Sequence, residues 1–335
     1  MKLSMFSVVD HYPEGGRDLR SLYGEVINQA VLADRLGFET VWLAEHHFID
    51  YGVVPNPAVM LASLAPRTSR VKLGPAISLL PFRDPRQIAE DYVMLDLLSG
   101  GRAVLGVGSG YVKPEFDGFG IPFEEKHARF NEGLDTVVKL IGGERVTLNG
   151  IYSRSGPIHL NVSSIQQRMP VFVAVGQRDG MTRVGAQGHS VMFMAYTMCN
   201  AIGDAAAIVG DYRQARKQAG HISAGTVAVG MHTHVGATDA EARDAAEEAF
   251  ARYCGTRLKA RKRSYEEAVN DGVVLFGSPQ TVADRLVALH RMGVDEFMTL
   301  HNFGLIDPSV AESSMKRLTQ NALPLVRERI LATAA

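Results

Sequence analysis

The sequence predicts a (β/α)8 barrel that spans residues 1–335 as a single α/β domain. Strand-like and helix-like segments alternate from one end to the other, and they form eight strand-then-helix units. No obvious linker divides the chain, and 46% of its 335 residues are hydrophobic, which is ample for a large core. The alternative arrangement is an open, doubly wound sheet of the kind that binds dinucleotides.

The first four units follow from apolar periodicity and from residues that favour helix ends. The first helix has an apolar stripe that begins at Leu22, and Gly37 ends it. Pro57 opens the second helix, and Asp84 caps the third ahead of Pro85. The strands of these units are expected at 3–9, 38–48, 71–80 and 102–110, and the helices at 22–36, 56–65, 84–98 and 124–140.

Three insertions interrupt this rhythm, near 111–123, 145–168 and 237–275. The second insertion is polar and is expected to hold a hairpin. The third is a charged helical segment, whose basic run from Arg257 to Arg263 is interpreted as a solvated helix face or a lid. The last four strands are expected at 171–175, 190–195, 225–235 and 296–302, and the helices at 179–187, 204–218, 279–292 and 308–330.

Composition and charge argue against several classes of function. The net charge is −1, so no basic field favours a nucleic acid or an anionic membrane as partner. No stretch approaches the apolar length of a membrane span, and the N-terminus lacks a signal core, so we expect a cytoplasmic protein. Cys199 and Cys254 show neither CxxC spacing nor a disulfide framework. There is no GxSxG, Walker A or HExxH motif.

The richest set of candidate catalytic side chains stands at the end of the second strand, in Glu45, His46 and His47. Functional groups of a (β/α)8 barrel gather at the C-terminal ends of its strands. Alternation along a strand puts Glu45 and His46 on opposite faces, so only one of them can face a given pocket. Histidine transfers protons near neutral pH, which makes this strand end a candidate acid–base site. An ordinary hydrogen-bonding role is the alternative.

The fourth strand carries glycine on one face, at Gly106, Gly108 and Gly110, with Ser109 between the last two. Either a flat ligand lies against this wall, or the barrel is tightly packed there. The sequence GVGSG resembles a dinucleotide fingerprint, but that fingerprint must feed directly into a helix. No helix pattern begins before about residue 124, so we reject the dinucleotide interpretation.

The seventh strand ends in His232 and His234, on the face that otherwise carries small residues. An HxH pair can bind a metal, but zinc or iron would need further ligands. We therefore interpret both residues as pocket-lining or hydrogen-bonded histidines, and we expect no metal.

The chain resembles the bacterial-luciferase-like flavin-dependent monooxygenases. The resemblance lies in four segments whose order and spacing match that family, and it is dense from residue 1 to about 140. These segments are FETVWLAEHHF, LGPAISLLPFRDP, AEDYVMLDLLSGGRAVLGVGSGY and FEEKHARFNEGLD. The family fold is a (β/α)8 barrel with insertions, in agreement with the count of units.

The resemblance implies a monooxygenase that uses reduced FMN from a separate NAD(P)H:flavin reductase, and O2, to oxidise a small organic substrate through a flavin C4a-hydroperoxide. It also implies a homodimer. His46 matches the family's catalytic histidine, with Glu45 or Asp50 tuning its protonation. The family's non-proline cis peptide matches Ala76-Ile77. The flavin-binding residues that the resemblance implies are Ala76, Ile77, Gly108, Ser109, Gly110, the phosphate-contacting Arg129, and a helix N-terminus at Gly176, Gln177 and Arg178.

Two departures bear on the cofactor site. Gly108 and Ser109 replace the cysteine and arginine of luciferase, and the loop GQRDGMT replaces a phosphate loop rich in serine and threonine, where Arg178 would compensate. A related branch of the fold uses the deazaflavin F420 for hydride transfer, which is the alternative function within enzymes. A non-catalytic flavin-binding subunit is a further alternative. The sequence does not identify the organic substrate.

Overall fold

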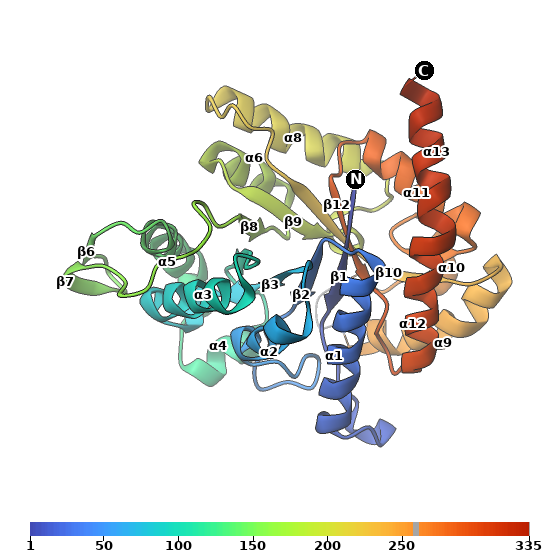
Figure 1. Ribbon diagram of the computed structural model, residues 1–335, viewed down its shortest axis with the longest axis horizontal. Helices are drawn as coiled ribbons and strands as arrows, with labels where there is room; N and C mark the ends of the chain where they lie inside the picture. Colours follow the sequence, from blue (N-terminus) through green and yellow to red (C-terminus); the bar gives the residue numbers. More distant parts are fainter. Residues whose placement is uncertain (257–260, 335) are drawn as a thin grey trace.

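The computed structural model describes residues 1–256 and 261–334, and its centre is a closed barrel of parallel strands (Figure 1). Hydrogen-bonded neighbours follow the order β3-β2-β1-β12-β10-β9-β8-β5-β4, and a bridge between Leu73 and Ala103 closes the ring. This arrangement confirms the predicted (β/α)8 barrel. The barrel strands are β1 (Lys2–Ser7), β2 (Thr40–Leu43), β3 (Lys72–Pro75), β4 (Ser78–Leu79), β5 (Leu105–Gly108), β8 (Val171–Ala174), β9 (Ser190–Met194), β10 (Val227–Val235) and β12 (Glu296–Leu300).

Strands β3 and β4 are two halves of the predicted third strand. The peptide bond between Ala76 and Ile77 is cis and separates them, at the position that the resemblance implied. A short strand, β11 (Leu275–Gly277), extends the sheet beside the end of β10.

The outer helices begin where the sequence places strong capping residues. Asn56, Asp84, Ser278 and Asp307 each accept a backbone N–H at a helix start, and each is followed by proline. Such caps stabilise a helix by roughly 0.5–2 kcal/mol each. The outer helices are α1 (Leu19–Leu36), α2 (Pro57–Leu64), α3 (Pro85–Ser99), α5 (Lys126–Ile141), α6 (Arg178–Gln187), α8 (Asp204–Gln218), α11 (Pro279–Arg291), α12 (Pro308–Arg317) and α13 (Leu323–Ala334).

The insertions add elements at the carboxyl end of the barrel and on its flank. The predicted hairpin is present as β6 (Val146–Asn149) and β7 (Arg154–Ile158). The third insertion holds α9 (Asp239–Thr256) and α10 (Tyr265–Asn270), and β9 is followed by a single turn, α7 (Ala195–Met198). Residues Arg257 and Lys259 of the basic run lie outside the described residues.

One expectation about the fourth unit is wrong. A short helix, α4 (Lys113–Phe119), begins four residues after β5, whereas the sequence pattern indicated none before residue 124. Its apolar face is too short to show a period, and Gly120 in the left-handed region ends it after two turns. The dinucleotide-binding fold is excluded for another reason, because that fold has an open sheet and this sheet is closed into a barrel.

The barrel floor is sealed by a buried polar contact. Glu296 on β12 accepts hydrogen bonds from Trp42 Nε1 (2.9 Å) and Ser4 Oγ (2.6 Å). The Trp42 ring packs edge-on against Phe172, with ring centroids 5.3 Å apart. Burial raises the pKa of Glu296. These residues close the barrel below the cavity described next.

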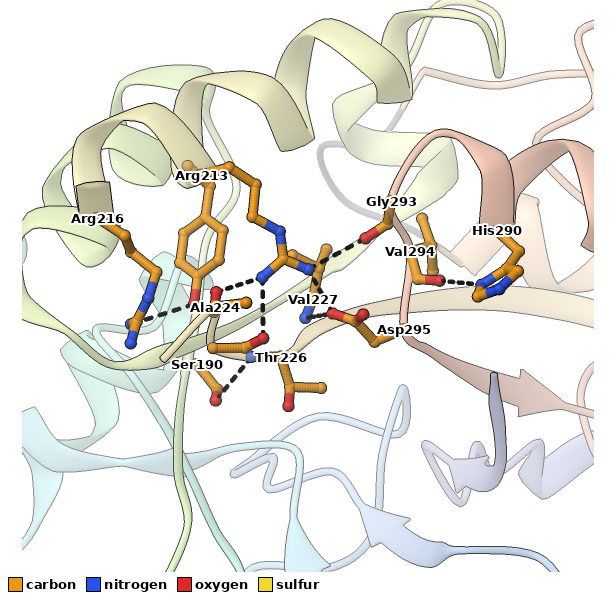
Figure 2. A network of polar contacts seen from close by, with 12 residues as sticks. Ser190, Arg213, Arg216, Ala224, Thr226, Val227, His290, Gly293, Val294 and Asp295 are labelled. Carbon is orange, nitrogen blue, oxygen red and sulfur yellow. Dashed lines mark hydrogen bonds and ion pairs between the residues drawn. The ribbon is translucent and has the colours of Figure 1, made fainter. Parts of the chain in front are cut away.

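A second polar network lies at the amino ends of β10 and β12 (Figure 2). Arg213 on α8 donates to the carbonyl oxygens of Ala224, Gly225 and Gly293, and to the carboxylate of Asp295 at 2.6 Å. Asp295 also accepts the backbone N–H of Val227 at 2.7 Å. One guanidinium thus joins α8 to the two loops that enter these strands, at the barrel end opposite the carboxyl ends of the strands.

Within residues 1–256 and 261–334, no helix is long and apolar enough to cross a membrane.

Candidate active site

A cavity of about 550 Å³ opens at the carboxyl ends of the barrel strands. Its floor is apolar, with Phe6 from β1, Met192 from β9 and Met298 from β12. Its walls come from the loops that follow the strands. Of the predicted site residues, the cavity is lined by Glu45, His46, Ala76, Ile77, Gly108, Ser109, Gly110, Gly176 and Gln177.

His46 is held by a carboxylate that sequence reasoning missed. Its Nδ1 lies 2.8 Å from Glu115 Oε1 on α4, and both side chains are buried. The same oxygen accepts the backbone N–H of His47 at 3.0 Å. Gly52 packs on the other side, where an added Cβ would lie 2.7 Å from His46 Cδ2. Nδ1 is therefore occupied, and Nε2 is the ring nitrogen left for a ligand.

Of the two carboxylates predicted to act on His46, Glu45 is paired with a different histidine. Strand β2 ends at Leu43, so the alternation of faces does not extend to Glu45 and His46, and both line the cavity. Glu45 Oε1 instead lies 3.0 Å from His47 Nε2. His47 also packs among phenylalanine rings, 5.7 Å from Phe82, which gives it a structural role. The sequence signal for Glu115 is weak, because α4 has only seven residues and Pro114 near its start is its clearest local helix marker.

The glycines of β5 are explained by tight packing. A Cβ at Gly106 would lie 2.2 Å from the carbonyl oxygen of Pro75, and one at Gly108 would lie 2.0 Å from Ile77 Cδ1. Packing against backbone excludes a side chain at Gly106, whereas the clash at Gly108 is with the end of the Ile77 side chain, which can move. Gly110 has φ of +73°, which favours glycine for a different reason. Gly108 and Ile77 together present a flat wall to the cavity.

Cations gather beside the N-terminus of α6. Lys126, His127 and Arg183 line the cavity, as do Gly176 and Gln177 at the start of this helix. Burial, Lys126 and Arg183 all lower the pKa of His127, and Asp179 opposes them, so this ring is a neutral hydrogen-bonding group beside two cations. A helix N-terminus and adjacent cations suit a phosphate group.

Two predicted phosphate contacts lie elsewhere. Arg129 is held by Glu125, with its Nη2 2.8 Å from the carboxylate, and its guanidinium stacks over Tyr152 at 4.3 Å. Arg178 points along the helix layer to Asp211, with its Nε 2.5 Å from Oδ2. Neither side chain lines the cavity, whereas Lys126, His127 and Arg183 do.

The remaining wall of the cavity is aromatic, with Tyr51, Tyr111, Tyr196 and Tyr253. Behind it lies His232, whose ring is 4.4 Å from Tyr253 and 5.2 Å from Tyr196. Among the residues that the structure describes, neither nitrogen of His232 has a hydrogen-bond partner, and burial lowers its pKa to about 3. In the part of the chain that the structure describes, no three metal-ligating side chains are grouped to hold an ion.

The chain belongs to the luciferase-like monooxygenase family, whose model matches residues 1–296. The barrel, the placement of the cavity at its carboxyl end and the buried His46 agree with this membership. The first curated relatives are two uncharacterized proteins of Sinorhizobium fredii, 37% and 32% identical. The chain spans about half the length of these relatives, 48% and 55%.

Characterised relatives include three kinds of enzyme. Limonene 1,2-monooxygenase of Rhodococcus erythropolis is 31% identical over 49% of this chain and 42% of its own length. The oxygenase component of flavin-dependent trigonelline monooxygenase from Acinetobacter baylyi is 25% identical over 98% of this chain and 96% of its own. F420-dependent glucose-6-phosphate dehydrogenase of Kineococcus radiotolerans is 32% identical over 46% and 47%.

Solved structures share the whole fold. Monooxygenase RslO1 of Streptomyces bottropensis superposes with a TM-score of 0.89 and 26% identity, over 97% of this chain and 99% of its own. The oxygenating constituent of 3,6-diketocamphane monooxygenase from Pseudomonas putida, a complex with FMN, has a TM-score of 0.82 and 22% identity, over 97% and 98%.

Proposed function

We propose that this protein is the oxygenase of a two-component flavin monooxygenase, which binds reduced FMN and uses O2 to oxidise a small organic substrate. The observation that carries the proposal is His46 in the cavity wall, with Nδ1 fixed by Glu115 at 2.8 Å. A positioned histidine is the side chain that most often performs proton transfer in enzymes. Bound reduced flavin supplies the electrons that activate O2.

The residues of the cavity fit a flavin mononucleotide. The flat wall of Ile77 and Gly108 suits a planar ring, and Ala76 and Gly110 border it. The phosphate would then lie beside Lys126, His127 and Arg183, and the N-terminus of α6 would donate further hydrogen bonds to it. These cations also suit the phosphate of another flavin derivative, so they do not by themselves select FMN.

His46 acts in this proposal through Nε2. The Nδ1–Glu115 contact sets the orientation and tautomer of the ring, because a carboxylate accepts the Nδ1 proton. Nε2 can then accept a proton from the bound reactants or return one to them.

Stopped-flow absorbance tests the proposal. Photoreduced FMN, mixed with the protein and air-saturated buffer, should reoxidise through a long-lived phase that free reduced FMN lacks. Reoxidation at the rate of free flavin would reject the proposal. His46→Ala should abolish turnover and leave reduced-FMN affinity within about tenfold. A much larger loss of affinity would assign His46 to binding.

Two alternatives separate in the same experiments. An F420-dependent hydride transfer is the second candidate, favoured by the relative that carries this cofactor in its name. Quenching of F420 fluorescence by the protein, without any effect on reduced FMN, would favour it. Flavin binding without a slow oxygen phase would favour a non-catalytic subunit.

The proposal includes two protein partners. Reduced FMN must come from a separate NAD(P)H:flavin reductase, as the name of the trigonelline relative, an oxygenase component, also suggests. The second partner is another copy of the chain. Helices α2 and α3 lie side by side (Figure 1). They carry the exposed apolar side chains Val59, Met94 and Leu98. Light scattering should give a dimer mass, and Met94→Lys with Leu98→Lys should give a monomer.

A further inference from the structure

The last residue of the basic run, Arg263, is buried and does not belong to a solvated face. Its side chain is 2% exposed and lines the cavity. It immediately precedes α10, whose start is fixed by a capping box between Ser264 and Glu267. A charged side chain stays buried only where partners satisfy it, so the contacts of this guanidinium indicate its role.

Three of these contacts lie in one part of the cavity wall, residues 196–200, here named the wall segment. The guanidinium Nη1 donates to the carbonyl oxygen of Tyr196 at 2.8 Å. Nη2 donates to the carbonyl oxygens of Cys199 and Asn200, at 2.9 and 3.1 Å. The residues of the wall segment that line the cavity are Tyr196, Thr197, Cys199 and Asn200. One side chain of the third insertion therefore holds the loop that follows β9.

The wall segment cannot keep its conformation by local structure alone. It begins within α7, a single turn, and an isolated turn is unstable because helix nucleation is unfavourable. The last carbonyl groups of a helix have no partner inside the helix, and buried carbonyl groups need one. Arg263 supplies donors to this end of the turn, and Asp204 accepts the backbone N–H of Asn200 at 2.8 Å. Two side chains outside the segment thus supply hydrogen bonds that its own turn cannot.

Asp271, at the other end of α10, also takes part in this contact. Its carboxylate accepts Arg263 Nε at 2.9 Å, and its carbonyl oxygen accepts the backbone N–H of Ile202 at 2.7 Å. Both ends of α10 are therefore attached to the chain that follows β9. The ion pair compensates the buried charge of Arg263, so this guanidinium acts as a hydrogen-bond donor to the backbone.

We propose that Arg263 is a positioning residue, whose guanidinium holds the wall segment in place against the cavity. The inference rests on the proposed function, because it makes the wall segment part of the cavity in which flavin and substrate would react. It gives one position of the basic run a specific role, which acts through the backbone of three residues that line the cavity.

The thiol of Cys199 reports on the wall segment, because a thiol is alkylated as the thiolate. Burial, and then Asp204, raise the pKa of this thiol to about 11, while Arg263 lowers it. Loss of the Arg263 charge alone would therefore raise this pKa further and slow alkylation. Displacement of the wall segment would instead expose the thiol, lower its pKa toward about 8.5 and speed alkylation. The two roles predict rate changes of opposite sign.

Alkylation of the full chain by iodoacetamide at about pH 8 measures this sign, and mass spectrometry of the cysteine peptides separates Cys199 from Cys254. In Arg263→Met, Cys199 should react about tenfold faster or more than in the wild type. Arg263→Lys keeps the charge without the planar fork, so it is a second, milder variant in which Cys199 should also react faster. Slower or unchanged alkylation in the variants that fold would overturn the positioning role.

Arg216→Met is the matched control. Arg216 is another buried arginine, 4% exposed, and it donates to the carbonyl oxygens of His189 and Ser223 beside the amino end of β9. Its loss should lower stability without displacing the wall segment, so Cys199 should react as in the wild type. An equal increase in Arg216→Met and Arg263→Met would assign the effect to global unfolding and overturn the inference.

Flavin reoxidation separates a positioning role from a merely structural one. A displaced wall segment would admit water to the cavity, so the slow oxygen phase should shorten in Arg263→Met and keep its lifetime in Arg216→Met. A slow phase of wild-type lifetime, in a variant whose Cys199 reacts faster, would make Arg263 a structural residue and overturn the inference.

Failure of this inference is distinguishable from failure of the proposed function. Faster alkylation of Cys199 in Arg263→Met, when the wild type has no slow oxygen phase, would keep the role of Arg263 in the wall segment and reject the oxygenase. A slow phase in the wild type, with unchanged alkylation in the variants, would reject the positioning role alone.

Discussion

The Nδ1 atom of His46 lies 2.8 Å from Oε1 of Glu115, although 69 positions separate the two residues in the chain. His46 follows β2 and Glu115 lies in α4, which follows β5. The pairing brings together two barrel loops and fixes one histidine nitrogen while the other stays available. Because Glu115 Oε1 already bonds His46 Nδ1 and the backbone N–H of His47, we propose that this carboxylate positions His46.

Replacement of Glu115 by glutamine should impair oxygen chemistry without removing the flavin. Glu115→Gln keeps the size of the side chain but removes a charge-assisted hydrogen bond worth about 1.5–3 kcal/mol. We expect turnover to fall by about tenfold to a hundredfold, with reduced-FMN affinity within about threefold. Nitrogen-15 NMR of the histidines should show a weakened Nδ1–H hydrogen bond at His46, a change that misfolding alone would not produce selectively.

The control for this variant is another carboxylate with backbone partners. Glu132 accepts the backbone N–H groups of Ile151 and Ser153 in the hairpin, outside the cavity. Glu132→Gln should leave both turnover and the His46 tautomer unchanged. Equal effects of the two variants would contradict a positioning role for Glu115.

Replacement of Arg183 should weaken FMN binding through the phosphate alone. Arg183→Gln removes one cation from the group at α5 and α6, so the affinity for reduced FMN should fall by about tenfold or more. Riboflavin, which lacks the phosphate, should bind as well as before. Anaerobic titration of both flavins measures the difference.

Arg129→Gln and Arg178→Gln are the matched controls, because both arginines pair with carboxylates away from the cavity. Neither should change the ratio of FMN to riboflavin affinity. A loss confined to Arg129→Gln would restore the contact that the family resemblance implied.

Acid should destabilise the protein through His232. Burial lowers the pKa of this ring to about 3, against about 6.5 for an exposed histidine. The neutral His232 ring therefore contributes fully to the free energy of unfolding above pH 6.5, and this contribution is lost progressively as the pH falls toward 3. His232→Phe removes this titration and keeps an aromatic ring in contact with Tyr196 and Tyr253. The free energy of unfolding of the variant, relative to that of the wild type, should rise by about 2 kcal/mol when the pH is lowered from 7.5 to 5.

Urea unfolding at the two pH values measures this gain. Other buried histidines, such as His301, titrate equally in both proteins and cancel in the comparison. A difference between variant and wild type that is the same at pH 5 and pH 7.5 would mean that the fold does not hold His232 neutral.

Loss of Arg213 should lower stability and spare the site. Arg213→Met removes the contacts to Asp295 and three carbonyl groups at the amino end of the barrel (Figure 2). Because the pair is partly exposed, we expect a loss of about 1–2 kcal/mol, or roughly 2–4 °C in Tm. Reduced-FMN affinity should not change. Lys139→Met, which breaks one exposed pair with Asp135, should leave Tm within about 1 °C.

Local rules were sufficient for most of the fold. Proline after a capping residue marks the starts of four outer helices, and the apolar strands between them leave few alternatives to a barrel. Helix α4 could not be predicted, because its two turns are too short to show a helical period. Glu115 lies in this helix, so its pairing with His46 could not be predicted either.

The errors at the site come from side-chain directions that local patterns do not determine. Extending the alternation of β2 past Leu43 placed Glu45 and His46 on opposite faces, but the chain leaves the strand there. The resemblance placed Arg129 and Arg178 at the phosphate, yet Glu125 and Asp211 hold both guanidinium groups elsewhere. Such pairings depend on neighbours distant in sequence or on competing local partners.

Trp42 is the single tryptophan of the chain, and its indole is fixed to Glu296 on the barrel floor beneath the cavity. Its emission therefore comes from one known position and one environment. A bound flavin absorbs light at the wavelengths where tryptophan emits, so occupancy of the cavity should quench this fluorescence by energy transfer. Ligand titrations and unfolding can both be followed by the natural optical probe of the chain, without any added label.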